Sequence, residues 1–292
     1  MSESVLADFV AQVRYDDAPR DQPQRCRVLL NRERLVVVSG DRRTTIGLET
    51  IFDLVTSTAA EEMADYFDHA VRVQYAADGR RRSIVLEGDL ERIDRFALIL
   101  YKAILRPITV TVKHPVNRGG LRRDPPARQA TVRPEARALV IDGDRLDATI
   151  DLSAVVDVRH VDRRLDDEHR TVVAVTYLDG RQTLVTELYA ESTRRQNVLA
   201  RFLERRLFKL EDALRNLTLG DEARQALVAL YAGVERDRLH HVLDEEGDGP
   251  GSDVDEILAE LQEAGLFEDD EEQSLARPAY LAVTRWTDDV VR

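Results

Sequence analysis

The chain has 292 residues, of which 43% are hydrophobic and 33% are charged, so it is long enough for two or three globular domains and too hydrophobic to be disordered throughout. No apolar run reaches the roughly 18 residues of a membrane span, and the acidic N-terminus does not resemble a secretory signal, so we expect a cytoplasmic protein. The single cysteine, Cys26, excludes an internal disulfide and every multi-cysteine metal site.

The charge is distributed unevenly. Residues 1–110 carry a net charge of −2, residues 111–210 carry +4, and residues 211–292 carry −15. A segment that is so negative repels nucleic acids and anionic membranes and attracts basic protein surfaces. Only 3 of the 42 basic residues are lysines, a composition typical of a salt-adapted cytoplasm or of a GC-rich genome.

The first 210 residues contain an internal repeat. Residues 25–53 align with residues 128–157 at a shift of 103, which becomes 104 after one inserted residue. The matched positions are Pro23 with Pro126, Arg34 with Arg137, Gly40-Asp41 with Gly143-Asp144, and Ile46 through Asp53 with Ile150 through Asp157.

Each copy continues with the same elements. Two β-branched strands flank a hairpin signal, Asp78-Gly79 in the first copy and Asp179-Gly180 in the second, and an amphipathic helix follows. Short strands, tight turns and one terminal helix are typical of a PH-like fold. We therefore predict an α+β protein with two tandem PH-like domains, each an open β-barrel with a C-terminal helix, over residues 1–106 and 107–217.

The second terminal helix, expected over residues 191–216, carries leucines at the a/d spacing of a coiled coil. These are Leu203, Leu207, Leu210, Leu214 and Leu217. Such a seam is buried either against another domain of the same chain or against a second chain, and the spacing leaves both alternatives open.

Residues 218–292 read as three helices, a small hairpin and a final helix beginning at Pro278, the element order of a winged-helix domain. The expected recognition helix, residues 253–265, has no Lys or Arg and five acidic residues, and the expected wing contains five consecutive acids at 268–272. Each of these charges repels a phosphate backbone. We predict a protein-binding domain, with a DNA-binding regulator as the alternative.

The sequence offers little for catalysis. It contains no nucleotide-binding or hydrolase motif, and the adjacent His240 and His241 cannot share one metal in the manner of an i, i+4 pair. We expect no catalytic residues, no metal and no cofactor. Three arginines, residues 80–82, follow the first hairpin turn and favour either a solvated tip or the alternative of a PH-like protein that binds anionic lipid.

Several segments resemble the haloarchaeal taxis adaptor family CheF. They are residues 1–10 (MSESVLADFV), 112–115 (VKHP), Gly119-Gly120, 150–155 (IDLSAV) and 226–231 (ALVALY). The resemblance spans the whole chain in order, and it is strongest before residue 233 and weakest from Asp244 onward.

This resemblance implies a non-enzymatic adaptor that links the phosphorylated response regulator CheY to the switch complex of the archaellum motor. It implies a homodimer recruited to the cytoplasmic face of the motor, with CheY, and possible further Che proteins, as partners. CheY would engage the C-terminal region, and by elimination the PH-like half would face the motor. Our hypothesis for the CheY contact face is Leu281, Trp286 and Val290 on the final helix.

Overall fold

The computed structural model describes most of the chain and divides it into two compact units. The described residues are 4–17, 23–40, 42–56, 69–165, 168–180, 182–205, 207, 214, 217–243, 253–268 and 274–290. The N-terminal unit comprises residues 1–177 and 184–208, and the C-terminal unit comprises residues 178–183 and 209–292. The N-terminal unit holds the first predicted repeat and most of the second, of which residues 178–183 and 209–217 fall in the C-terminal unit. The finer division into three domains stays a prediction.

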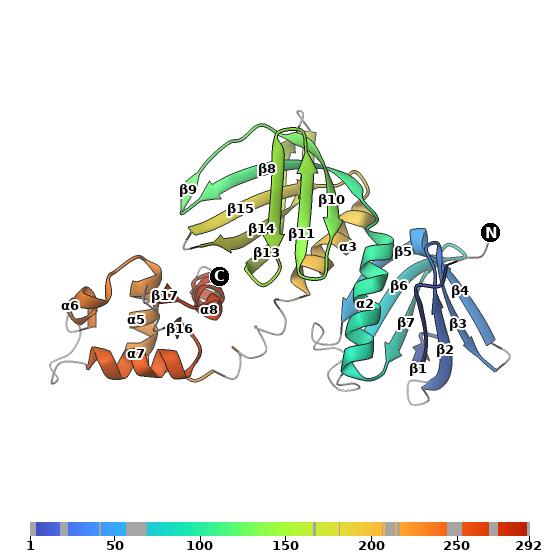
Figure 1. Cartoon of the computed structure of the whole chain (residues 1–292), viewed down its shortest axis with the longest axis horizontal. Helices are drawn as coiled ribbons and strands as arrows, with labels where there is room; N and C mark the ends of the chain where they lie inside the picture. Colours follow the sequence, from blue (N-terminus) through green and yellow to red (C-terminus); the bar gives the residue numbers. More distant parts are fainter. Residues whose placement is uncertain are drawn as a thin grey trace. The chain divides into compact units, whose positions relative to one another are not determined.

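Two antiparallel sheets form the N-terminal unit (Figure 1). The strands of the first are β1 (Ala7–Tyr15), β2 (Gln24–Leu30), β3 (Arg34–Ser39), β4 (Arg42–Gly47), β5 (Ile51–Thr56), β6 (Ala70–Ala77) and β7 (Arg80–Glu87). Those of the second are β8 (Ile108–Arg118), β9 (Leu121–Arg122), β10 (Arg128–Pro134), β11 (Ala138–Gly143), β12 (Leu146–Asp151), β13 (Val155–Leu165), β14 (Glu168–Asp179) and β15 (Gln182–Tyr189).

The two sheets have the same topology. The first runs β4-β3-β2-β1-β7-β6-β5 and the second β12-β11-β10-β8-β15-β14-β13, with β9 added beside β8. Both carry a bulge at the same place, between Ile51 and Asp53 and between Val155 and Asp157. The predicted α+β class is confirmed, and the shared topology of the two sheets supports the predicted duplication. Among the described strands neither sheet closes into a barrel, and the PH-like assignment stays a prediction.

The alignment of the repeats is wrong by one residue in its first half. Because β2, β3, β4 and β5 begin 104 residues before β10, β11, β12 and β13, Arg34 corresponds to Ala138 and not to Arg137. Burial shows why: the fully buried Leu35 then matches the fully buried Leu139. A slip of one residue would turn every core side chain of the strand to the opposite face. The identities at a shift of 103 are coincidental, whereas the match of Ile46 through Asp53 at 104 holds.

Two helices lie between the sheets (Figure 1). Helix α2 (Leu90–Ile104) begins at Asp89, whose side chain accepts a hydrogen bond from the backbone N of Arg92 (3.0 Å). Helix α3 (Thr193–Glu204) begins at Ser192, which caps it in the same way, and packs on both β5 and β13. The helix of the second repeat therefore also covers the sheet of the first.

Polar contacts between the repeats accompany this packing. Arg194 donates to the backbone oxygens of Leu48 (2.9 Å), which begins the short helix η1 (Leu48–Thr50), and of Ile51 (3.1 Å), which follows it. Arg201 donates to Asp53 (3.1 Å), the aspartate that follows the first bulge. Each contact joins residues more than 140 positions apart, so the two repeats share one interior.

The C-terminal unit is helical, with one small hairpin. Its elements are α5 (Asp221–Tyr231), η3 (Arg236–Arg238), α6 (Leu239–Leu243), α7 (Val254–Glu263), β16 (Phe267–Glu268), β17 (Ser274–Leu275) and α8 (Arg277–Val290). This is the predicted order of elements, and the winged-helix assignment itself stays a prediction. Gly233 and Gly265 follow the last residues of α5 and α7 by two positions and adopt φ values of 90° and 68°, as glycines that end helices do. Of the described helices, none has the length and apolar character needed to cross a membrane.

Candidate partner-binding surfaces

The three residues of the predicted contact face of α8 differ from one another in their surroundings. Trp286 is partly buried and packs against the core of the C-terminal unit, and the guanidinium of Arg224 lies 5.8 Å from the centre of its ring. Leu281 is only 1% exposed, so direct contact with a partner requires α8 to move. The side chain of Val290 lies outside the described part of the structure. The role of all three as contacts stays a prediction.

A more exposed apolar row lies on the neighbouring helix α5. Val228 is 42% exposed and Tyr231 is 41% exposed, and with Arg224 they follow at i, i+4 and i+7 on one side of the helix. The ring of Tyr231 packs edge-on against that of Tyr280 at the start of α8, with ring centres 5.7 Å apart. We call Arg224, Val228, Tyr231, Tyr280 and Trp286 the α5–α8 surface.

The sequence analysis missed this row, although the signal was present. Leu227, Leu230 and Tyr231 share the helical spacing of a core stripe, which makes Tyr231 look like a core residue. Leu227 is fully buried, whereas Tyr231, one turn later, is 41% exposed. The presence of Val228 and Tyr231 outside the row of Ala223, Ala226 and Leu227 indicates a second apolar face.

Helix α7 presents acidic side chains to solvent. Asp253 caps the helix by accepting hydrogen bonds from the backbone N of Asp255 (3.0 Å) and of Glu256 (3.4 Å). Asp255 and Glu256 are exposed, and Arg236 pairs with Asp255 at 2.7 Å. Glu260 accepts from the backbone N of Gly220 (2.8 Å), which joins α7 to the start of α5. The acidic face thus belongs to the same unit as the α5–α8 surface.

The leucines of the heptad-spaced seam lie in two different cores. Leu203 and Leu207 are buried in the N-terminal unit, with 0% and 3% exposed. Leu214 and Leu217 are partly buried against the core of the C-terminal unit, and Leu210 lies outside the described residues. Pairing of the seam with a second chain stays a prediction.

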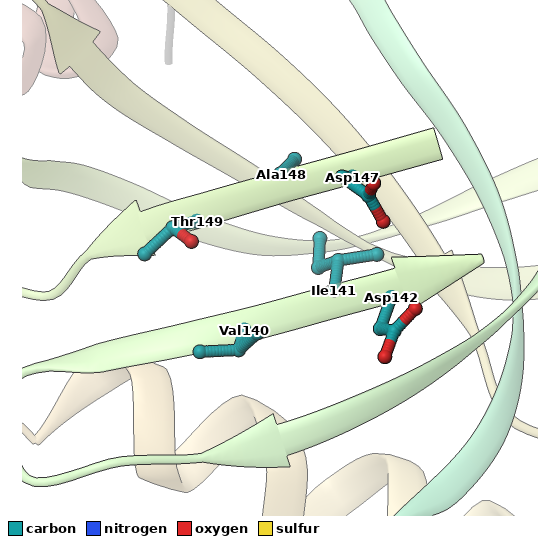
Figure 2. Close-up of a pocket in the computed structure, with 6 residues that line it drawn as sticks. All are labelled: Val140, Ile141, Asp142, Asp147, Ala148 and Thr149. Carbon is teal, nitrogen blue, oxygen red and sulfur yellow. The ribbon is translucent and has the colours of Figure 1, made fainter. Parts of the chain in front are cut away.

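A shallow hollow of about 430 Å³ lies on the hairpin of β11 and β12. Figure 2 shows its lining, in which Val140 stands opposite Thr149 and Asp142 opposite Asp147. Two carboxylates that face each other across a strand pair repel. Nowhere in the described residues do three or more His, Cys, Asp or Glu side chains gather as a metal site would require.

Comparison with known proteins identifies the family. The model of the family CheF-arch, described as archaeal chemotaxis signal transduction system protein F, matches residues 5–208. Taxis protein CheF2 of Halobacterium salinarum is 34% identical over 290 residues, which cover 99% of each chain. Taxis protein CheF1 of the same organism is 21% identical over 232 residues, or 79% of this chain and 75% of that protein. The chain therefore belongs to the CheF family of archaeal taxis signalling proteins, as the resemblance in its sequence indicated.

Proposed function

We propose that this protein is a non-enzymatic adaptor that carries the signal of the phosphorylated response regulator CheY to the switch complex of the archaellum motor. The observation that supports it most is the relation to Taxis protein CheF2, which extends over 99% of both chains and so includes the C-terminal unit that the family model does not cover. On this proposal the protein acts in the cytoplasm, beside the motor.

The C-terminal unit is the proposed contact for CheY. Its α5–α8 surface combines two tyrosines, one tryptophan and one arginine, the residue types that dominate binding energy at protein interfaces. The exposed carboxylates of α7, in a region of net charge −15, favour a partner with a basic face. The N-terminal unit, with its two sheets, is left to face the motor.

Signal transfer then requires a difference in affinity. Phosphorylation moves CheY toward one of two conformers, and the adaptor reports the signal only by as much as it prefers that conformer. A tenfold preference corresponds to about 1.4 kcal/mol, which one or two aromatic contacts supply.

The test is calorimetric titration of the full chain with CheY from the same genome, with and without beryllofluoride as a phosphoryl mimic, in molar KCl. We expect binding that strengthens with the mimic and that Tyr231→Ala weakens by about 5- to 30-fold, which corresponds to a loss of about 1 to 2 kcal/mol. Trp286→Ala should act in the same direction.

Val242→Ala is the matched control, because Val242 is as exposed as Tyr231 (41%) but lies on α6, outside the α5–α8 surface. Absence of binding in both states of CheY, with both proteins folded, would make the proposed function wrong. If CheY binds and Tyr231→Ala leaves its affinity unchanged, the proposed function stands, but the α5–α8 surface is not the contact for CheY.

The proposed homodimer is tested separately, by light scattering of the purified chain. A monomeric mass at tens of micromolar would contradict it.

A further inference from the structure

A short hairpin extends the second sheet at one end (Figure 1). Among the described strands β9 pairs only with β8, and the turn between them is Gly119-Gly120, with φ values of 57° and 80°. Glycine adopts two consecutive positive φ values without strain, which makes a tight hairpin turn possible. A Cβ on either glycine would meet nothing within 4 Å, so the turn points into open space. We call residues 116–124 the prong.

The prong carries an exposed leucine. Leu121 is 71% exposed, more than any other large hydrophobic side chain in the described residues. It stands opposite Arg118 in the strand register, and because alternate residues share a face, Arg123 lies on that face as well. Arg122 points to the other face. Guanidinium groups therefore flank the leucine on both sides of the hairpin.

The prong is locally basic. Residues 116–124 contain three arginines and one acid, Asp124. That acid is already held by Lys113, whose ammonium lies 2.8 Å from the carboxylate. The charge that the prong offers to a partner is therefore positive.

We propose that the prong is a membrane-contacting element that docks on the anionic headgroup surface of a phospholipid bilayer. Leu121 enters the boundary between headgroups and acyl chains, and the flanking arginines bind lipid phosphates. Arginine suits this role because its planar group binds phosphate oxygens in pairs. A basic segment near an anionic leaflet is attracted by its surface potential, and an apolar side chain adds insertion to that attraction.

The shape of the prong favours a bilayer over a protein. A rigid protein surface would need a preformed pocket for one convex leucine and carboxylates placed to meet arginines on both faces of a hairpin. Headgroups surround an inserted side chain from every direction, so both faces are engaged at once. One leucine gives weak binding, since even a single myristoyl chain binds membranes only with an association constant on the order of 10⁴ M⁻¹.

The first repeat provides the matched control. Its hairpin between β6 and β7 is followed by three arginines, but Arg81 lies over the ring of Phe52 (5.4 Å) and Arg82 pairs with Asp16 (3.8 Å). No large hydrophobic side chain at this hairpin is among the exposed ones of the described residues. Arg80→Glu with Arg81→Glu changes the charge as much as Arg122→Glu with Arg123→Glu does, without touching the prong.

The experiment places a polarity-sensitive nitrobenzoxadiazole dye on Leu121→Cys in the full chain. Cys26 is 1% exposed, so labelling is directed to the introduced thiol. Vesicles of phosphatidylglycerol, and separately of phosphatidylcholine, are titrated to about 10 mM lipid in 0.1 M KCl, where a Debye length of about 10 Å leaves the attraction between the arginines and an anionic leaflet in place. The same dye on Leu90→Cys, at the exposed start of α2, reports a surface outside the prong.

We expect the dye at position 121 to gain at least twofold in emission with phosphatidylglycerol only, and the dye at position 90 to stay unchanged. Arg122→Glu with Arg123→Glu should lower the apparent lipid affinity at least fivefold, and the control pair in the first repeat less than twofold. Equal responses to both lipids, or no response in either, would overturn the proposal and leave an acidic protein as the partner of the prong.

Discussion

At the scale of single residues, Tyr101 of α2 links the helix to the first sheet. Its side chain is 1% exposed, its hydroxyl donates to the backbone oxygen of Leu54 in β5 (2.7 Å), and its ring meets that of Phe202 of α3 at 5.7 Å. Helical spacing alone indicates that Tyr101 lies on the buried face of α2. The hydroxyl partner, 47 residues away, depends on tertiary packing, and no spacing along the chain could indicate it.

Burial keeps the hydroxyl of Tyr101 protonated and raises its pKa above the ordinary value of 10. Burial likewise raises the pKa of Tyr15 to about 12. A group whose pKa is higher in the folded state stabilises the fold below its unfolded pKa and loses that contribution as the pH rises. We therefore expect the free energy of unfolding to fall as the pH rises above 10.

Tyr101→Phe tests this linkage. At pH 7 the free energy of unfolding of the variant should be about 1 kcal/mol lower than that of the wild type, because the carbonyl of Leu54 loses a buried donor. From pH 10 to pH 11 the free energy of unfolding should fall by about 1 kcal/mol less in the variant than in the wild type, because Phe has no proton to release on unfolding. Urea titrations at pH 7, 10 and 11 measure both effects. Parallel pH profiles would show that Tyr101 is not the titrating group.

At the scale of elements, α3 is shared by the two repeats. The bulge after Ile51 and the short helix before it aim two backbone oxygens outward, and Arg194 binds both. The half-buried guanidinium has a pKa lowered by burial. Without this side chain, the backbone oxygens of Leu48 and Ile51 would lose the donor that Arg194 provides.

Arg194→Ala should therefore cost about 1 to 2 kcal/mol, the range for hydrogen bonds from a charged group, reduced for partial exposure. Arg195→Ala removes an identical side chain one position later, where it is exposed, and should change stability by less than about 0.5 kcal/mol. Chemical denaturation of the two variants provides the comparison. Equal losses would mean that the contact contributes nothing specific.

The elements also show what sequence patterns can and cannot predict. Hydrophobic period and turn residues located both hairpins, both terminal helices and the order of the C-terminal helices, because these are local signals. The predicted alignment of the repeats was wrong by one residue, because it followed a few identical residues rather than the core positions Leu35 and Leu139. The exposed face of α5 was missed for a related reason: Tyr231 is apolar enough to be assigned to the core, and only packing shows that it is not there.

At the scale of the whole molecule, charge separates the two units. Residues 211–292 carry a net charge of −15, whereas the rest of the chain is nearly neutral. Like charges in a compact unit repel, and salt screens that repulsion. The stability of the C-terminal unit should therefore depend on KCl much more than that of the N-terminal unit, although both belong to one chain.

Trp286 allows the two units to be followed separately, because it is the single tryptophan and lies in the C-terminal unit. At 0.1 M KCl we expect its fluorescence to report unfolding at a lower temperature than the circular dichroism of the sheets. At 2 M KCl the fluorescence midpoint should rise by several degrees more than the sheet midpoint, since about 1 kcal/mol shifts the melting of a domain of this size by about 4 to 8 °C. Coincident transitions at every salt concentration would mean that the chain unfolds as one cooperative body, and that the charge of the C-terminal unit is balanced by the rest of the protein.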